Sequence, residues 1–238
     1  MYKLKPKEDR GQSLTDWSKS LHSFSFAQYF DPYSMGFSDL RVINDNIVLP
    51  QNGYKFHTHS NMEIINIVLL GKLDYKDTTG KVIRLNRGQI QVISAGTGIM
   101  HSELNNSEKN FLHFLQIWIL PKKKNVDPKT TVKEFGKKDV HNKLCLVVSE
   151  NGTGGSLPIN QDVNIYQCVL DSQSVVTYSL KDNRKLWIQV ANGAIDINGN
   201  ILESGDGISI VNETGELEIC GVDLESDFMI FDLRQLKI

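Results

Sequence analysis

Three of the six histidines lie within one stretch of 45 residues, and two glutamates accompany them. One residue separates His57 from His59, and one residue separates His101 from Glu103. In an extended strand, side chains two apart project from the same face. Two such pairs on facing strands can therefore converge on one metal ion. Imidazole and carboxylate ligands together suit iron, manganese, nickel, copper or zinc.

Glu63 competes with Glu103 for the carboxylate position. It has the same parity as His57 and His59, so parity alone supplies one ligand too many. Glu103 shares a strand face with His101, and the spacing does not decide between the two glutamates. Three histidines and one carboxylate leave one or two positions open on a five- or six-coordinate metal. Open positions distinguish a catalytic metal site from a closed structural one.

The chain around these residues has the pattern of short strands joined by turns. Residues 64–70 form a β-branched, apolar run that ends at Gly71. Residues 72–77 and 81–85 flank a Thr-Thr-Gly turn, and residues 111–120 form a further apolar run. Strands at this spacing predict an all-β sandwich or barrel.

A weak repeat indicates that this unit occurs twice. Residues 65–74 have the same pattern of apolar and turn residues as 186–195, and a polar, Lys-rich segment over 121–138 lies between the copies. We therefore predict two tandem β-barrel domains, residues 1–135 and 136–238. No histidine follows His141, so only the first domain is expected to hold a metal.

Composition restricts the other functions. The formal charge of −2 gives no reason to expect nucleic acid as a partner. The three cysteines are too few and too scattered to suggest a disulfide framework or a zinc site. The N-terminal residues lack an apolar targeting segment, and no apolar run is long enough to span a membrane. These features predict a cytoplasmic protein with reduced thiols.

Two motifs resemble the pirin family, a group of bicupin proteins. They are His57-x-His59-x-x-x-Glu63 and the stretch 95–103, Ala-Gly-Thr-Gly-Ile-Met-His-Ser-Glu, with the Gly88 turn between them. The stretches 22–26, 29–32 and 40–45 also resemble bacterial pirin-like proteins. The resemblance implies two β-sandwich, jelly-roll cupin domains, with one divalent metal, usually iron(II), in the first. Cupins in general often use the glutamate of the first motif.

Carried over position by position, the pirin resemblance implies a specific ligand set. Its members are His57, His59, His101 and Glu103, which leaves Glu63 behind the ligands in a supporting position. Thr58 departs from the pattern, because pirins commonly have proline between the first two ligands. That departure removes no donor group. His113 is a second candidate for a supporting position, although a hydrogen-bonded core histidine is the simpler interpretation.

The same resemblance implies quercetin 2,3-dioxygenase activity, in which O2 opens the ring of a flavonol and carbon monoxide is released. A small planar aromatic substrate and O2 would be the partners, and Glu103 could act both as ligand and as general base. The alternative is a non-enzymatic, iron-dependent regulator that binds partner proteins. An enzyme needs a pocket beside the metal, whereas a regulator needs an exposed binding face.

Overall fold

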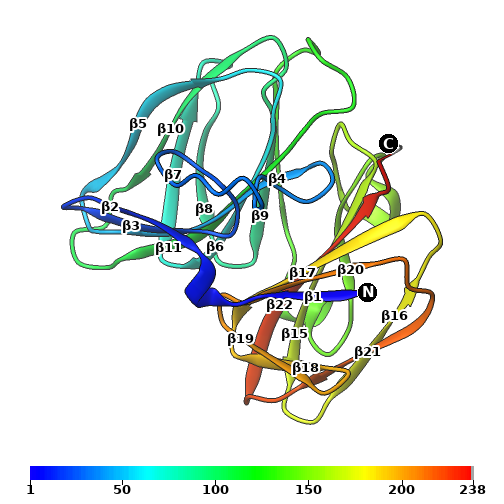
Figure 1. Ribbon diagram of the computed structural model, residues 1–238. Coiled ribbons are helices and arrows are strands. Elements are labelled where there is room, and N and C mark those ends of the chain that lie inside the picture. Colours follow the sequence, from blue (N-terminus) through cyan, green and yellow to red (C-terminus); the bar gives the residue numbers. More distant parts are fainter. Residues whose placement is uncertain (237–238) are drawn as a thin grey trace. The chain divides into compact units, whose positions relative to one another are not determined.

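The computed structural model describes residues 1–236, and nearly all of its regular structure is β-strand, as predicted. The chain divides into two compact units (Figure 1). The N-terminal barrel comprises Gly11–Glu134 and Leu157–Gln161. The C-terminal barrel comprises Met1–Arg10, Phe135–Ser156 and the chain from Asp162 onward. Two sheets build each barrel, which confirms the prediction of two sandwich domains.

The N-terminal barrel pairs a seven-stranded sheet with a four-stranded sheet. The larger sheet has the order β12-β9-β6-β11-β4-β3-β2, and the smaller one β5-β10-β7-β8. The strands of the larger sheet are β2 (Gly11–Leu14), β3 (Ser18–His22), β4 (Leu40–Val48), β6 (Glu63–Leu70), β9 (Gln89–Ser94), β11 (Leu112–Ile119) and β12 (Lys129–Glu134). Those of the smaller sheet are β5 (Asn52–His59), β7 (Lys72–Asp77), β8 (Val82–Asn86) and β10 (Ile99–Asn105). The short strand β14 (Leu157–Pro158) also belongs to this unit.

The core of this barrel lies between its two sheets. Ile64 of β6 packs with Tyr75 of β7, and Val68 of β6 packs with Leu73. Strand β6 is buried on both faces, which explains why its sequence is a continuous apolar run rather than an alternating one. The strand is followed by Gly71, which has a φ of +82° and where a Cβ would lie 2.4 Å from the carbonyl oxygen of Phe111, so this turn requires glycine.

The C-terminal barrel repeats the same plan. One sheet contains the order β1-β20-β17-β22-β15-β13, and the other has the order β16-β21-β18-β19. The first contains β1 (Tyr2–Lys5), β13 (Cys145–Ser149), β15 (Val163–Asp171), β17 (Arg184–Asn192), β20 (Gly207–Val211) and β22 (Glu225–Arg234). The second contains β16 (Val175–Leu180), β18 (Ala194–Ile197), β19 (Asn200–Glu203) and β21 (Gly215–Gly221). Short helical turns are α1 (Lys137–Val140), η1 (Lys7–Asp9) and η2 (Thr153–Gly155).

The two units differ from the division expected at residues 135 and 136. Strand β1 pairs antiparallel with β20, so the first residues of the chain complete the C-terminal barrel. Leu157–Gln161 belongs instead to the N-terminal barrel. Both exchanges depend on pairing between segments far apart in sequence, which local periodicity does not reveal.

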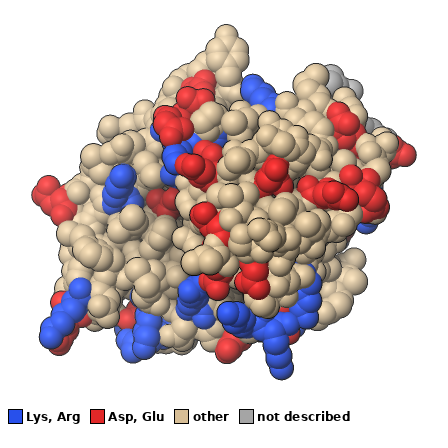
Figure 2. All heavy atoms as spheres, turned by 90° about the horizontal axis from the view of Figure 1, so that it is seen from below, with Lys and Arg blue, Asp and Glu red and all other residues tan. Residues whose placement is uncertain are grey.

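The cysteines form no disulfide framework, as the sequence predicted, and the surface carries charges of both signs (Figure 2). Cys145, Cys168 and Cys220 form no disulfide, and burial raises the pKa of the Cys168 thiol to about 12. The face shown in Figure 2 carries acidic and basic side chains. Within residues 1–236 no helix is both long and apolar enough to cross a membrane.

Candidate metal centre

The three histidines of the two motifs meet on neighbouring strands. His57 and His59 end β5, His101 lies near the start of β10, and His57 stands directly opposite His101 in the antiparallel pair. The ring centroid of His57 lies 4.5 Å from that of His101, and the ring of His59 lies 4.9 Å from each of the other two. One nitrogen from each ring falls in a group whose members all lie within 4.8 Å of one another. The predicted convergence of these imidazoles is confirmed.

A β-bulge in β5 sets the direction of His57. His57 pairs with His101 and Tyr54 pairs with Glu103, so two residues of β5 lie opposite one residue of β10 between these pairs. The extra residue leaves Lys55 and Phe56 both exposed, while the side chains on either side of them turn inward. The same bulge brings the Lys55 carbonyl to 2.8 Å from His57 Nδ1. A donating Nδ1–H leaves the lone pair on His57 Nε2, the arrangement common in metal-binding histidines.

The ring nitrogens that face one another in the cluster fit a metal ion. His57 Nε2 lies 3.0 Å from His101 Nε2. His59 Nε2 is buried and has no hydrogen-bond partner among the described residues. A buried polar atom without a partner is costly, and coordination would satisfy it. Three converging imidazole nitrogens are a donor set that divalent transition metals accept.

Burial keeps two of these imidazoles neutral. Burial, and after it the neighbouring histidines, lower the pKa of His59 to about 4 and that of His101 to about 3. Metal ligation requires the neutral form. Near pH 7 neither ring must lose a proton before it can coordinate a metal.

We expect the same burial to make the metal-free protein sensitive to acid. Since the unfolded His101 titrates near 6.5 and the folded one near 3, the unfolded state binds more protons between these values. The free energy of unfolding therefore falls as the pH drops below about 6.5, by about 2 kcal/mol for this residue between pH 8 and pH 5. Urea unfolding with a chelator present should show that the free energy of unfolding falls less between these pH values in His101→Leu than in the wild type. Equal losses would contradict the assignment.

Glu103 lies beside the cluster but is held by other groups. The carboxylate is 1% exposed. Its Oε1 accepts a hydrogen bond of 2.6 Å from Asn66 Nδ2, and its Oε2 accepts one of 2.7 Å from Gln116 Nε2. Burial raises the pKa of Glu103, while the Asn66 and Gln116 amides and the nearby His57 and His59 lower it. Glu103 is not a member of the three-histidine group.

Aromatic rings border the histidines. The Trp118 ring lies 4.8 Å from that of His59, and the Tyr75 ring lies 5.4 Å from that of His101. Phe26 packs against Trp118 at 5.3 Å. These rings limit water beside the site. Sequence analysis missed Trp118 and Tyr75, since each has the pattern of an ordinary core residue.

Glu63 and His113 lie away from the cluster. Strand β5 ends at His59, and β6, which begins at Glu63, belongs to the other sheet. The chain reverses between them through Asn61, whose φ is +49°. Parity therefore does not carry from the histidines to Glu63.

Both residues project from the side of the seven-stranded sheet opposite to Ile64 and Gln116. Glu63 Oε2 accepts hydrogen bonds from Ser94 Oγ at 2.6 Å and from the backbone N–H of Asn160 at 3.3 Å. His113 Nε2 lies 2.6 Å from Asp45 Oδ1, as the interpretation of a hydrogen-bonded structural histidine predicts. The expectation that either residue supports the ligands from behind is not met in this arrangement.

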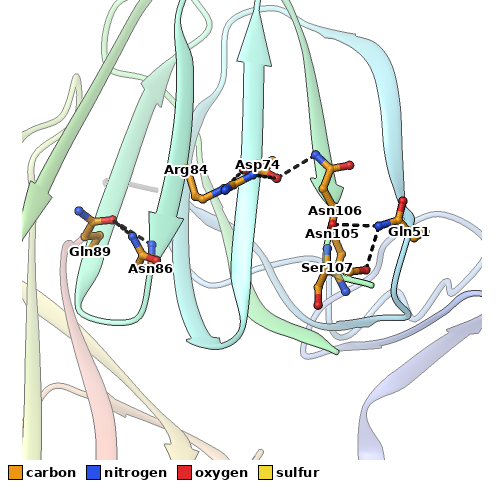
Figure 3. A network of polar contacts seen from close by, with 8 residues as sticks. All are labelled: Gln51, Asp74, Arg84, Asn86, Gln89, Asn105, Asn106 and Ser107. Carbon is orange, nitrogen blue, oxygen red and sulfur yellow. Dashed lines mark hydrogen bonds and ion pairs between the residues drawn. The ribbon is translucent and has the colours of Figure 1, made fainter. Parts of the chain in front are cut away.

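An open groove of about 520 Å³ reaches His57. Trp17, Tyr54, Lys55, Leu104 and Asn106 contribute to its lining. Two hydrogen bonds hold Asn106 in the wall of the groove (Figure 3). Gln51 Nε2 donates to the Asn106 carbonyl oxygen at 2.9 Å, and Asn106 Nδ2 donates to Asp74 at 2.8 Å. Arg84 in turn holds Asp74 through two hydrogen bonds. The groove therefore has a braced wall beside the candidate metal site.

Known proteins resemble this chain along most of its length. The family model described as Pirin matches residues 3–119, and the one described as Quercetinase C-terminal cupin domain matches residues 146–233. A protein of Escherichia coli K12 named quercetin 2,3-dioxygenase is 38% identical over 235 residues, which cover 98% of this chain and 99% of that protein. The chain belongs to the pirin family. Its two barrels are therefore tandem cupin domains, as the resemblance implied.

Solved pirin structures extend the likeness to three dimensions. The crystal structure of YhhW from Escherichia coli is 36% identical, covers 100% of both chains and superposes with a TM-score of 0.94. A second YhhW structure, described as a bacterial pirin in complex with nickel(II), has a TM-score of 0.93 and covers 99% of this chain and 100% of that one. A divalent metal is thus observed in a pirin that shares this fold throughout.

We expect the C-terminal cupin domain to bind no transition metal tightly. Among residues 1–236, the only group of at least three potential ligands close enough to share an ion is His57, His59 and His101. A full-length protein with all three replaced by alanine should therefore show no stoichiometric metal by elemental analysis after incubation with nickel(II). Metal retained by that variant would locate a second site and contradict this expectation.

Proposed function

We propose that this pirin is a metal-dependent dioxygenase that opens the ring of a flavonol such as quercetin with O2 and releases carbon monoxide. The observation that carries the proposal is the convergence of three histidine nitrogens within 4.8 Å beside an open groove. Full-length similarity to proteins named quercetin 2,3-dioxygenase supports it. We assign the metal to iron(II), with nickel, zinc, copper and manganese as alternatives that the same donors accept.

The proposed ligands are His57, His59, His101 and Glu103. When bound, the metal would supply Lewis acidity at the flavonol 3-hydroxyl and a redox partner for O2. His57 is oriented by its hydrogen bond to the Lys55 carbonyl, so that its Nε2 faces the site. The rings of Trp118 and Tyr75 restrict water around the other two histidines. The four side chains thus supply donors, and the aromatic rings supply a dry environment.

Glu103 is also the proposed general base. Burial raises its pKa, which increases its affinity for a proton relative to an exposed glutamate. Both of its oxygens accept amide hydrogen bonds, an arrangement that suits the ionised carboxylate. It would take the proton of the flavonol 3-hydroxyl as the substrate binds.

The groove favours an enzyme over an iron-dependent regulator. A regulator that docks on partner proteins needs a binding face but no opening beside the metal. Here His57 itself lines the groove, together with Trp17 and Tyr54, whose rings pack edge to face at 5.3 Å. A planar aromatic substrate would reach the site between the edge strand β5 and the turn that carries Trp17.

An aerobic quercetin assay tests the proposal. Purified protein is first analysed for metal, and loss of quercetin absorbance is then followed together with release of carbon monoxide. We expect turnover in proportion to bound metal, none without O2, and none in His101→Ala. A fully metal-loaded wild-type protein that leaves quercetin intact would refute the proposed activity.

A further inference from the structure

A row of buried amides crosses the seven-stranded sheet of the N-terminal barrel. Gln91 of β9 stands opposite Asn66 of β6, and Asn66 stands opposite Gln116 of β11. Asn66 and Gln91 are 0% exposed, and Gln116 is 7% exposed. Along β6 the neighbours of Asn66 on the same face are Ile64 and Val68, which belong to the apolar core. Burying amides among apolar side chains costs free energy unless each amide has a hydrogen-bond partner.

Two of these amides bond to Glu103. Asn66 Nδ2 donates to Glu103 Oε1 at 2.6 Å and also to Gln91 Oε1 at 3.0 Å. Gln116 Nε2 donates to Glu103 Oε2 at 2.7 Å, while its Oε1 accepts a bond of 3.1 Å from Trp118 Nε1. Each carboxylate oxygen is therefore held by its own amide. The amides come from the larger sheet and the carboxylate from the smaller one.

The C-terminal barrel provides an internal comparison. Strand β17 lies between β20 and β22 in the C-terminal barrel, as β6 lies between β9 and β11 in the N-terminal barrel. Its core-facing residues are Leu186, Ile188 and Val190, and the central one pairs across both neighbouring strands with isoleucine. In the strands that correspond by sheet order to those of Asn66, Gln116 and Gln91, the central core-facing row is therefore made of isoleucines: Ile188, Ile230 and Ile208.

The comparison shows that the fold does not require the amides. The same strand arrangement packs with three isoleucines in the barrel that has no histidine cluster. The amide row also leaves Asn66 Oδ1 and Gln91 Nε2 buried without a hydrogen-bond partner among the described residues. Both facts favour a role at the site over a role in packing.

We propose that Asn66 and Gln116 are positioning residues that fix the orientation of the Glu103 carboxylate toward the metal. The proposal rests on the proposed function in that Glu103 is taken as a metal ligand. The terminal torsion of a glutamate has a broad energy minimum, so an unrestrained carboxylate would rotate. Two amides that donate to opposite oxygens remove that freedom before the metal arrives. Gln116 also connects the carboxylate to Trp118, which borders His59.

Nickel(II) binding to the full-length protein tests this role without using the reaction. Asn66→Ile and Gln116→Ile introduce the residues of the C-terminal barrel, and each should bind nickel about 10–100-fold more weakly than the wild type in a chelator competition. Asn66→Leu and Gln116→Met keep the side-chain shape and should give the same loss if an isoleucine variant fails to fold.

The matched control is Gln189→Leu. Gln189 is a buried amide of the C-terminal barrel that donates to the carbonyl oxygens of Gly205 and Asp206. Its loss should lower the unfolding temperature and leave nickel affinity unchanged. A general effect of deleting a buried amide is thereby separated from an effect on the site.

A double-mutant cycle with Glu103→Leu gives the decisive result. If the amides act through Glu103, Asn66→Ile and Gln116→Ile cause no further loss of nickel affinity once Glu103 is absent. In the Glu103→Leu background these isoleucine substitutions should raise the unfolding temperature, because they remove buried amides that have lost their acceptor. The same loss of nickel affinity in both backgrounds, or no loss in the wild-type background, overturns the proposal.

Wild-type protein that binds nickel but leaves quercetin intact refutes the dioxygenase activity alone, since the cycle does not depend on turnover. Failure of the wild type to bind either nickel(II) or iron(II) refutes both.

Discussion

The His101→Ala protein should bind no stoichiometric metal. His101 is 0% exposed, and its Nε2 lies 3.0 Å from that of His57, so its removal leaves a gap that no neighbouring donor fills. The metal stabilises only the folded state, and free metal at a hundred times its dissociation constant adds about 2.7 kcal/mol to the free energy of unfolding. We expect nickel(II) or iron(II) to raise the unfolding temperature of the wild type and to leave that of His101→Ala unchanged. His59→Ala should behave in the same way.

The control for this experiment is His113→Ala. His113 also lies in a strand of the N-terminal barrel, but it bonds to Asp45 on the opposite side of the sheet from the cluster. Its loss should reduce stability slightly and leave metal binding intact. The carboxylate assignment has a separate check. Loss of metal in Glu63→Ala, with retention in Glu103→Ala, would show that the fourth ligand has been assigned incorrectly.

Sequence alone predicted the parts of the site that depend on local geometry. His57 and His59 share a face because they are two apart in one strand, and His101 meets them because β10 pairs with β5. The alternation rule failed where the strand was not continuous. Glu63 has the expected parity but begins another strand in another sheet.

The supporting residues could not be predicted, because their role depends on pairing between distant strands. Asn66 occurs within an apolar run, and only the register of β6 with β11 places it beside Gln116 under Glu103. Polar amides at core positions of apolar strands were the available signal. The exchange of β1 into the C-terminal barrel is equally non-local, since Tyr2 pairs with Ile210.

Glu103→Gln should reduce quercetin turnover by about 10²–10⁴-fold, the usual contribution of a general base. The substitution keeps the length and shape of the side chain but removes the group that accepts the substrate proton. It also places an amide NH2 where a carboxylate oxygen now accepts a bond from Asn66 or Gln116. Gln116 can relieve this conflict by turning its own amide, at the cost of its bond to Trp118. Turnover must therefore be expressed per bound metal, and metal content is measured in the same samples.

Glu63→Gln is the matched control, since Glu63 is the other fully buried glutamate of the N-terminal barrel and bonds to Ser94 away from the histidines. Turnover per bound metal should fall in Glu103→Gln and persist in Glu63→Gln. Loss of metal from Glu103→Gln would indicate that the carboxylate acts chiefly as a ligand. A metal-loaded Glu103→Gln protein that turns over at the wild-type rate would remove Glu103 from proton transfer, because an amide cannot accept the hydroxyl proton under these conditions.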